Sequence, residues 1–232
     1  MQDEIIKHTK NIHGAMSNKN KMKNIFLGLV ALILLSSCAV SRKVKYDGLK
    51  LDLFDIKTKN IDLALLDHRE AVIDGSRKPD FVGYMRSNVG IAFPMGTQSK
   101  NNFMYDLSNN IVNSLKRFDI VVTNLDTKWQ DEEQSVKTQL LSLNGDKKVL
   151  LVFDQLNTDG YMIQFLYYKI NMYVYDKNGV LLKYKAIDGK EKLGGNVAFG
   201  AGSYKTYMPD AISKLFEDIF KDQEILELIN KN

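Results

Sequence analysis

Hydrophobic residues recur along this chain with two different periods, and each period predicts a different kind of element. Between 104 and 118 they recur at spacings of three and four, which is typical of one face of a helix. That face holds Met104, Leu107, Ile111, Leu115 and Phe118. From 166 to 174 the period is two, with Leu166, Tyr168, Ile170, Met172 and Val174 on one side. This second pattern predicts a strand with one face on the core.

Turn and capping residues place the neighbouring elements. Asp176 to Gly179 reads as a turn in which Gly179 takes a positive φ, so 180–187 is predicted to return as the second strand of a hairpin. Pro209 and Asp210 suit the first turn of a C-terminal helix. Its apolar stripe comprises Ala211, Ile212, Leu215, Phe216, Ile219 and Phe220, with Ile225, Leu226 and Ile229 as an extension.

Short apolar runs predict the remaining strands. The compact runs at 61–66 and 149–153 are typical of strands that enter a core, and 118–122 follows the first helix as another strand. A short strand is expected at 49–54, and a polar connection with a short helix at 125–145. This order indicates an α+β single domain, with a largely antiparallel sheet and two amphipathic helices packed on one face.

The segment 67–100 has no helical period and holds two of the three prolines of the chain. Short strands are expected within it at 81–84 and 89–93. A long irregular segment in a compact domain tends to carry function.

A predicted membrane-targeting segment precedes the domain. Lys21 and Lys23 are followed by an eleven-residue apolar run at 25–35, too short to span a bilayer but typical of a signal peptide. The sequence Leu-Ser-Ser-Cys that ends at Cys38 resembles a bacterial lipobox, in which the cysteine receives the lipid. We therefore predict a leader at 1–37, with Met16 or Met22 as a second candidate start, a lipidated N-terminus and tether at 38–59, and a periplasmic domain at 60–232.

Two other readings of this N-terminal stretch stay open: an uncleaved anchor, and a buried thiol that happens to follow an apolar run. Cys38 is the only cysteine, so the chain has no internal disulfide. Ala39 and Val40 are not acidic. By resemblance to enteric-type lipoproteins, this favours an outer-membrane anchor with the domain facing the periplasm.

Charge argues against nucleic acid as a partner. The whole chain has a formal charge of +4, but residues 38–232 hold 27 Lys and Arg against 26 Asp and Glu. A nucleic-acid-binding domain would carry clustered basic residues and a clear excess of positive charge. Attachment to the membrane would instead come from acyl chains on Cys38.

Histidine and cysteine usage narrows the possible chemistry. His8 and His13 lie in the predicted leader, which leaves His68 alone in the domain. Zinc prefers nitrogen and sulfur ligands, so no metal site or cofactor is predicted. No G-x-S-x-G elbow is present to carry a serine nucleophile.

Two clusters of residues are candidates for a functional site. Asp67, His68 and Arg69 follow a predicted strand and offer a titratable group beside a guanidinium, as an envelope hydrolase or a small anion site would need. The simpler interpretation is a capped strand end, because no oxyanion donors accompany them. The glycines at 194, 195, 200 and 202 match neither phosphate-binding loop pattern and read as a flexible connection.

One resemblance to a known family rests on 61–118. The run 61–66 followed by Asp-His-Arg, then DGSRKPDFVGYMRSNVGIAFPMGTQS and the helix near 105–116, resembles the YajG-like family of bacterial lipoproteins. The resemblance implies an outer-membrane or periplasmic lipoprotein and implies no catalytic residues.

The function expected from these observations is a non-enzymatic, membrane-anchored binding module for an unidentified envelope protein or ligand. Phe81, Tyr84, Arg86 and Phe93 are its expected contacts, since aromatic and Arg side chains are common interface anchors. The alternatives are a hydrolase that uses Asp67, His68 and Arg69, and a carrier of a small ligand or lipid.

Overall fold

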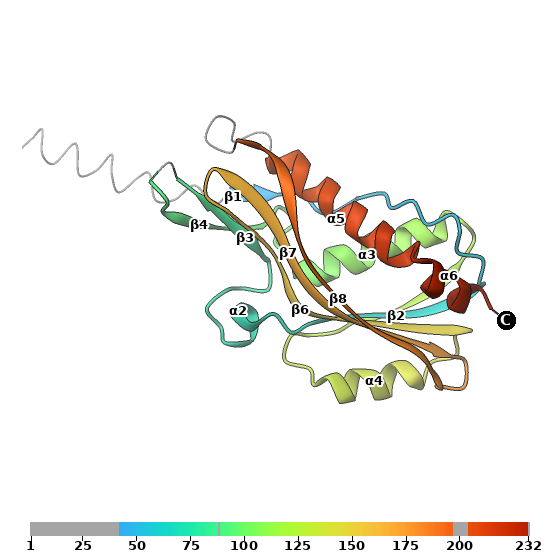
Figure 1. Ribbon diagram of the computed structural model, residues 1–232. Helices are drawn as coiled ribbons and strands as arrows, with labels where there is room; N and C mark the ends of the chain where they lie inside the picture. Colours follow the sequence, from blue (N-terminus) through green and yellow to red (C-terminus); the bar gives the residue numbers. More distant parts are fainter. Residues whose placement is uncertain (1–41, 88, 197–203, 232) are drawn as a thin grey trace, which may run out of the picture. The chain divides into compact units, whose positions relative to one another are not determined.

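The computed structural model describes residues 42–87, 89–196 and 204–231, which belong to one folded unit (Figure 1). Its strands are β1 (Arg42–Val44), β2 (Asn60–Asp67), β3 (Phe81–Arg86), β4 (Ala92–Thr97), β5 (Val121–Leu125), β6 (Lys147–Asp159), β7 (Ile163–Asp176) and β8 (Leu181–Asn196). Its helices are α2 (Glu70–Ile73), α3 (Phe103–Lys116), α4 (Glu133–Leu141), α5 (Tyr204–Phe220) and α6 (Gln223–Asn230).

The eight strands form one sheet that branches at β6. One edge of β6 pairs with β7, which in turn pairs with β8. The other edge pairs first with β2, from Lys147 to Phe153, and then with β3 at Thr158. The first branch therefore ends in β2 and β5, and the second in β3, β4 and β1. A bulge in β6 between Phe153 and Gln155 lies between the two branches.

The sheet is mixed, which corrects the prediction of a largely antiparallel sheet. β2 is parallel to both β5 and β6, β3 is parallel to β6, and β1 is parallel to β4. The hairpins β3–β4, β6–β7 and β7–β8 are antiparallel. The continuous apolar runs of β2 and β6 fit this arrangement, because parallel strands are usually buried on both faces.

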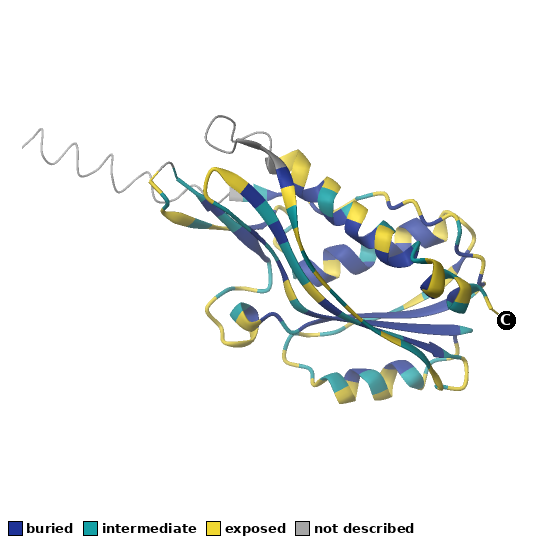
Figure 2. Cartoon of the chain, viewed as in Figure 1, coloured by how far each residue is buried: buried dark blue, intermediate teal, exposed yellow. Residues whose placement is uncertain are grey.

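The two predicted amphipathic helices, α3 and α5, pack on one face of the sheet, and α4 covers the opposite face (Figures 1 and 2). Side chains alternate along β2 and β6, so Leu63 and Leu151 join the core under α3, α5 and α6. Ala64 and Leu150 point the other way and pack in a smaller core with Val136 and Leu140 of α4. A polar helix with only two buried residues is therefore sufficient to close the second face.

Two predicted elements are confirmed closely. α3 begins and ends within two residues of its expected bounds, and Met104, Leu107, Ile111 and Leu115 of its apolar stripe are buried. Phe118 lies beyond the end of the helix and is 37% exposed. The turn after β7 has Gly179 at a φ of 81°, and the Asp176 side chain accepts hydrogen bonds from the backbone N–H groups of Asn178 and Val180. β3 and β4 are also present in the segment expected to hold short strands.

Other expectations need correction. Residues 49–54 form no strand, and Tyr46, Leu51, Leu53 and Ile56 are buried, so the segment predicted as a tether packs onto the folded unit from residue 43 onward. α5 begins at Tyr204 and contains Pro209, and α6 is a separate helix capped by Asp222. Of the glycine-rich stretch, residues 200 and 202 lie outside the described residues.

Candidate functional site

An open cleft of about 670 Å³ lies where the loop before β3 and the loop after β5 meet the start of α3. β2 and β5 are parallel neighbours, so their carboxyl ends lie at the same edge of the sheet, where α/β proteins commonly bind ligands. The lining comprises Lys43, Lys78, Pro79, Asp80, Lys100, Asn101, Asn102, Tyr105, Asp126, Thr127, Lys128, Trp129 and Gln130. Its volume falls within the range of about 300–1,000 Å³ typical of small-ligand sites.

The lining is positively charged, with four lysines against two aspartates. Lys43 is paired with Asp80 at 2.7 Å. The ammonium groups of Lys78, Lys100 and Lys128 make no ion pair with any described carboxylate and are exposed. The cleft therefore presents several cations that are available to a negatively charged group.

Aromatic side chains accompany these lysines. Tyr105 lies on the first turn of α3 and is 47% exposed, and Trp129 is the only tryptophan of the chain. Such side chains offer an apolar face together with a hydrogen-bonding group, which suits contact with a partly polar ligand. Cations and aromatic faces together give the cleft the makeup of a binding surface.

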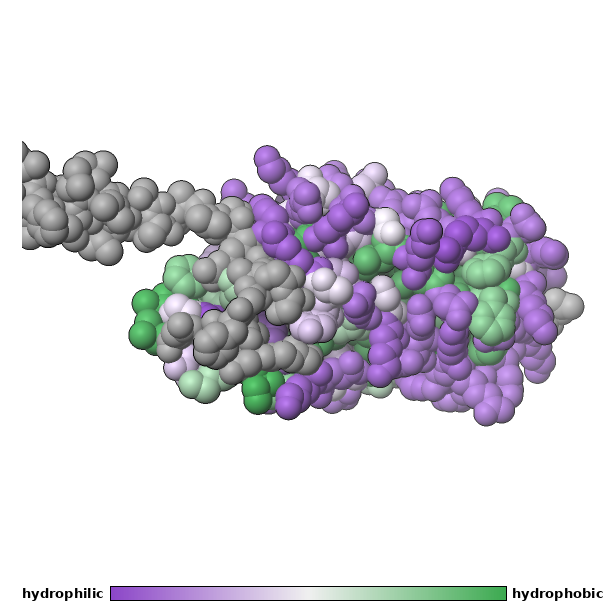
Figure 3. Space-filling model, turned by 90° about the horizontal axis from the view of Figure 1, so that it is seen from above, coloured by the Kyte–Doolittle hydropathy of each residue, from purple (hydrophilic) through white to green (hydrophobic). Residues whose placement is uncertain are grey.

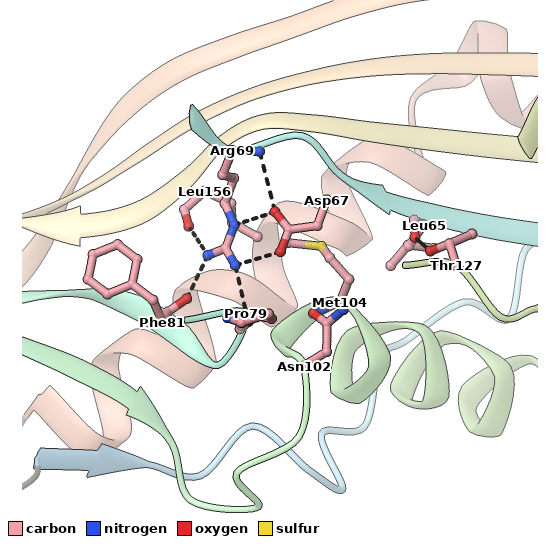
Figure 4. Close-up of polar contacts among 9 residues, drawn as sticks. All are labelled: Leu65, Asp67, Arg69, Pro79, Phe81, Asn102, Met104, Thr127 and Leu156. Atoms are coloured by element: carbon pink, nitrogen blue, oxygen red, sulfur yellow. Dashed lines mark hydrogen bonds and ion pairs between the residues drawn. The ribbon is translucent and has the colours of Figure 1, made fainter. Parts of the chain in front are cut away.

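A buried ion pair supports the wall of the cleft (Figure 4). Arg69 donates from Nε to Oδ1 of Asp67 at 2.7 Å and from Nη2 to Oδ2 at 2.8 Å. The same guanidinium donates to the carbonyl oxygens of Phe81 (2.6 Å), Leu156 (3.3 Å) and Pro79 (3.3 Å). It thus fastens the end of β2 to β6 and to the loop that carries Pro79 into the cleft.

Arg69 also packs against an aromatic pair at the start of α3. Its guanidinium carbon lies 5.4 Å from the centre of the Phe103 ring, and the Tyr46 ring lies 4.7 Å from that ring on centroids. Burial raises the pKa of the Tyr46 hydroxyl far above its ordinary value, so Tyr46 stays neutral. Asp67 and Arg69 are only 1% and 3% exposed, and they bond to each other and to backbone carbonyls. They therefore support the wall of the cleft but do not line it.

Local capping fixes two other walls of the cleft. The Asn102 side chain accepts a hydrogen bond from the N–H of Met104 at 3.0 Å and caps α3. Asp106, on the first turn of that helix, is buried and accepts hydrogen bonds from Ser99 and Asn101. Thr127 donates to the carbonyl oxygen of Leu65 in β2, which ties the loop after β5 to the sheet (Figure 4).

His68 does not join Asp67 and Arg69. Its backbone N–H donates to the carbonyl of Phe153 at 3.0 Å, and its Nε2 lies 3.2 Å from the carbonyl oxygen of Asp131. Asp67 and Arg69 form a pair with each other, and the imidazole between them is bonded elsewhere. The three residues predicted as a cluster therefore do not converge on one point.

The residues expected as interface contacts are mostly engaged within the fold. Phe81 is buried against Tyr84, and the Tyr84 hydroxyl accepts a hydrogen bond from Arg77 at 3.1 Å. Arg86 makes a bidentate pair with Asp159 at 2.7 Å for both bonds, which raises the pKa of this guanidinium. Phe93 is half-buried in β4, opposite Met85.

The cleft residues were not identified from the sequence. Lys43, Lys78, Lys100 and Lys128 come from four separate segments, so no local cluster marks them. One signal was available, because Trp129 stands in a polar stretch without an apolar pattern, where burial gives no reason for a tryptophan. Tyr105, on the polar side of α3, is a second such signal.

Cys38, the predicted lipidation site, lies outside the described residues. Within 42–87, 89–196 and 204–231, no helix has both the length and the apolar content to cross a membrane. In the same ranges, no group of three or more His, Cys, Asp or Glu side chains is placed to hold a metal ion.

No protein-family model matches the chain, and no curated protein does. Among solved structures, it is similar to protein XCC0632 from Xanthomonas campestris, with 9% identity, 80% of this chain and 93% of that chain covered, and a TM-score of 0.48. It is also similar to the hypothetical protein CT253 from Chlamydia trachomatis, with 13% identity, coverage of 76% and 100%, and a TM-score of 0.44.

A third similar structure is the lipoprotein GNA1162 from Neisseria meningitidis, with 9% identity, coverage of 69% and 97%, and a TM-score of 0.36. All three identities are at most 13% and all three TM-scores are below 0.5. Similarity at this level identifies neither a family nor an activity, and the YajG-like resemblance stays a prediction.

Proposed function

We propose that this chain is a lipid-anchored bacterial envelope protein that binds a negatively charged partner in the lysine-lined cleft and catalyses no reaction. The observation that carries the proposal is the set of unpaired ammonium groups of Lys78, Lys100 and Lys128 beside Tyr105 and Trp129. Lysine offers a strongly hydrated point charge that suits carboxylate or phosphate groups without demanding one geometry. The anchor is the predicted lipid on Cys38, and the expected location is the periplasmic side of the outer membrane.

The binding role agrees with the hypothesis from the sequence that the segment 67–100 contacts a partner, but it rests on other residues of that segment. The segment 67–100 contributes Lys78, Pro79, Asp80 and Lys100 to the cleft, whereas Phe81, Tyr84 and Arg86 of the same segment are held by internal contacts. The hydrolase alternative loses its support from geometry, because Asp67 and Arg69 are bonded to each other and to backbone carbonyls.

Photo-crosslinking in living cells tests the cleft. A photoreactive residue at Tyr105 lies in the cleft, and the same residue at Phe118 is a matched control, since Phe118 is an exposed aromatic just beyond the other end of α3. A partner adduct at 105, absent at 118 and weakened by Lys78→Glu with Lys128→Glu, supports the proposal. No adduct at 105, or equal adducts at both positions, contradicts it.

Two further measurements separate the alternatives. Metabolic labelling with a fatty acid should mark the wild-type chain and not the Cys38→Ala variant, and a label that persists in the variant contradicts the anchor. His68→Ala should leave the envelope phenotype of the cells unchanged if the protein is a binding module. An enzyme that used His68 as its general base would lose about 10²-fold or more of its rate.

A further inference from the structure

Two hairpin ends meet and form an exposed apolar patch. Its members come from the β3–β4 connection, from the β6–β7 turn and from the first residue of β7. They are Val89 (79% exposed), Ile91 (58%), Tyr161 (47%), Met162 (59%) and Ile163 (37%). In Figure 1 the two connections lie next to each other at the left, and apolar surface shows at that end of the space-filling view in Figure 3. We call these five residues the hairpin-end patch.

Specific contacts hold the two hairpin ends together. Arg86 at the end of β3 pairs with Asp159 at the end of β6 and also donates to the carbonyl oxygen of Gly90 at 3.3 Å. A Cβ placed on Gly90 would lie 4.0 Å from the Tyr161 ring. Gln164 donates to the carbonyl oxygen of Tyr84 at 2.7 Å. The patch is therefore one built surface and not two independent loops.

The patch is free of charge. The stretches SNVGIAF at 87–93 and GYMIQF at 160–165 contain no Asp, Glu, Lys or Arg. The nearby charged side chains of Arg86 and Asp159 are paired with each other. Exposed apolar side chains suit the boundary between lipid headgroups and acyl chains, where aromatic residues are also favoured. A charged protein partner would find no complementary group within these stretches.

The course of the chain points to the same membrane that carries the predicted lipid. β1 is parallel to β4, with Arg42 opposite Met95, so the chain enters β1 from the same side as it enters β4. The patch residue Ile91 immediately precedes β4. Cys38 is four residues before Arg42 and can therefore lie no more than about 14 Å from it at full extension. A lipid on Cys38 would keep the hairpin-end patch close to the bilayer surface.

We infer that the hairpin-end patch inserts into the interface of the anchoring membrane and forms a second contact beside the lipid. This inference rests on the proposed lipid anchor. A lipid chain alone fixes position and leaves orientation free, whereas a second point of contact restricts how the folded unit is presented to the periplasm. The consequence for function is that the orientation of the cleft toward its partner is also restricted.

The test uses the full lipidated chain in vesicles of phosphatidylethanolamine and phosphatidylglycerol that contain a nitroxide-labelled lipid. An environment-sensitive fluorophore is attached through Val89→Cys in the patch or through Val180→Cys in the β7–β8 turn, since lipidation consumes the thiol of Cys38. Val180 is a matched control, because it is 57% exposed and is separated from the patch by the 14 residues of β7, a strand about 45 Å long.

We expect the label at 89 to be quenched several-fold more strongly than the label at 180, and Ile91→Ser with Met162→Ser to reduce that difference. Equal quenching at both positions, in a protein shown by mass spectrometry to carry the lipid, would overturn the inference and leave the anchor intact. If mass spectrometry finds no lipid on Cys38 but the label at 89 is still quenched, the patch is supported and the proposed anchor is overturned.

Discussion

Arg69 offers a direct test of how the fold supports the cleft. Replacement by Met keeps an unbranched side chain of similar length and removes the guanidinium that bonds Asp67 and three backbone carbonyls. The carboxylate of Asp67, 1% exposed, is then left without its cation. Breaking a buried pair by removing one partner costs about 3–5 kcal/mol, because an uncompensated charge stays buried.

This loss is large compared with the stability of an ordinary domain. The free energy of unfolding of natural domains is about 5–15 kcal/mol, so Arg69→Met should remove at least about a fifth of it. With a urea slope of about 2–3 kcal/mol/M, the midpoint should fall by about 1–2.5 M. Arg69→Met with Asp67→Asn should be more stable than Arg69→Met alone, because it removes the buried charge. It should not regain wild-type stability, because the three carbonyls still lack their donor.

Equilibrium urea unfolding measures these values, followed by circular dichroism and by the emission of Trp129, which lies in the cleft. Arg86→Met is the matched control. Arg86 and Asp159 form a pair with nearly the same bidentate geometry, but their side chains are 33% and 25% exposed, against 4% and 1% for Arg69 and Asp67. Solvent should make the loss at Arg86 much smaller. Equal losses for the two variants would refute the argument that burial sets the importance of this pair.

Three further predictions concern stability. Gly83→Ala should destabilise the β3–β6 junction, because Gly83 has a φ of 144° and a Cβ there would lie 2.3 Å from the Thr158 carbonyl oxygen. The variant should therefore show a lower melting temperature than wild type in thermal unfolding. Leu140→Ala should cost about 2–5 kcal/mol in urea unfolding, because this fully buried side chain joins α4 to the second face of the sheet. Asp222→Ala should cost about 0.5–2 kcal/mol through loss of the α6 cap. The hydrogen bond from Lys185 lowers the pKa of Asp222. The stability that this carboxylate contributes is therefore complete above about pH 4 and is lost as the pH falls through the lowered pKa. Unfolding measured at about pH 7 and at about pH 3 should show a smaller effect of Asp222→Ala at the lower pH.

Local pattern was sufficient for elements whose own sequence determines them. The period of α3 and the turn chemistry at Asp176 and Gly179 placed a helix and a hairpin correctly, since each depends on residues within one segment. Strand direction depends on which strands become neighbours, and that is a property of the whole chain. The apolar runs of β2 and β6 did carry a signal of burial on both faces, and with it a helix on the second face would have been expected.

Pro209 shows a different limit of sequence reasoning. Its lack of a backbone N–H suits the first turn of a helix, so the sequence predicts that the helix begins there. In the structure α5 begins five residues earlier, so proline is carried within the helix near its start. A helix can include a proline beyond its first turn when packing of later residues offsets the missing hydrogen bond. In α5 this packing comes from Ile212 and Leu215, which are buried in the main core.

The site shows the same division between local and long-range information. In an extended segment successive side chains point to opposite sides, so residues 67 and 69 lie on one side and residue 68 on the other. This alternation argues against a site made of all three side chains. Their pairing through a buried bidentate contact depended on the carbonyls of Pro79, Phe81 and Leu156, which no local pattern could bring near.

The net charge of a domain and the positions of its charged residues are separate properties, and the cleft depends on the positions. Residues 38–232 are almost neutral in sum, which argues against a broad basic surface of the kind that binds nucleic acid. The same sum is compatible with lysines from β1, the loop before β3, the loop before α3 and the loop after β5 that gather around one cleft. In the proposed function, a cleft of this size would accept a small acidic group or the acidic tip of a partner, not an extended polyanion. Near-neutrality elsewhere would favour this contact, because the partner would be attracted to the cleft and not to the rest of the surface.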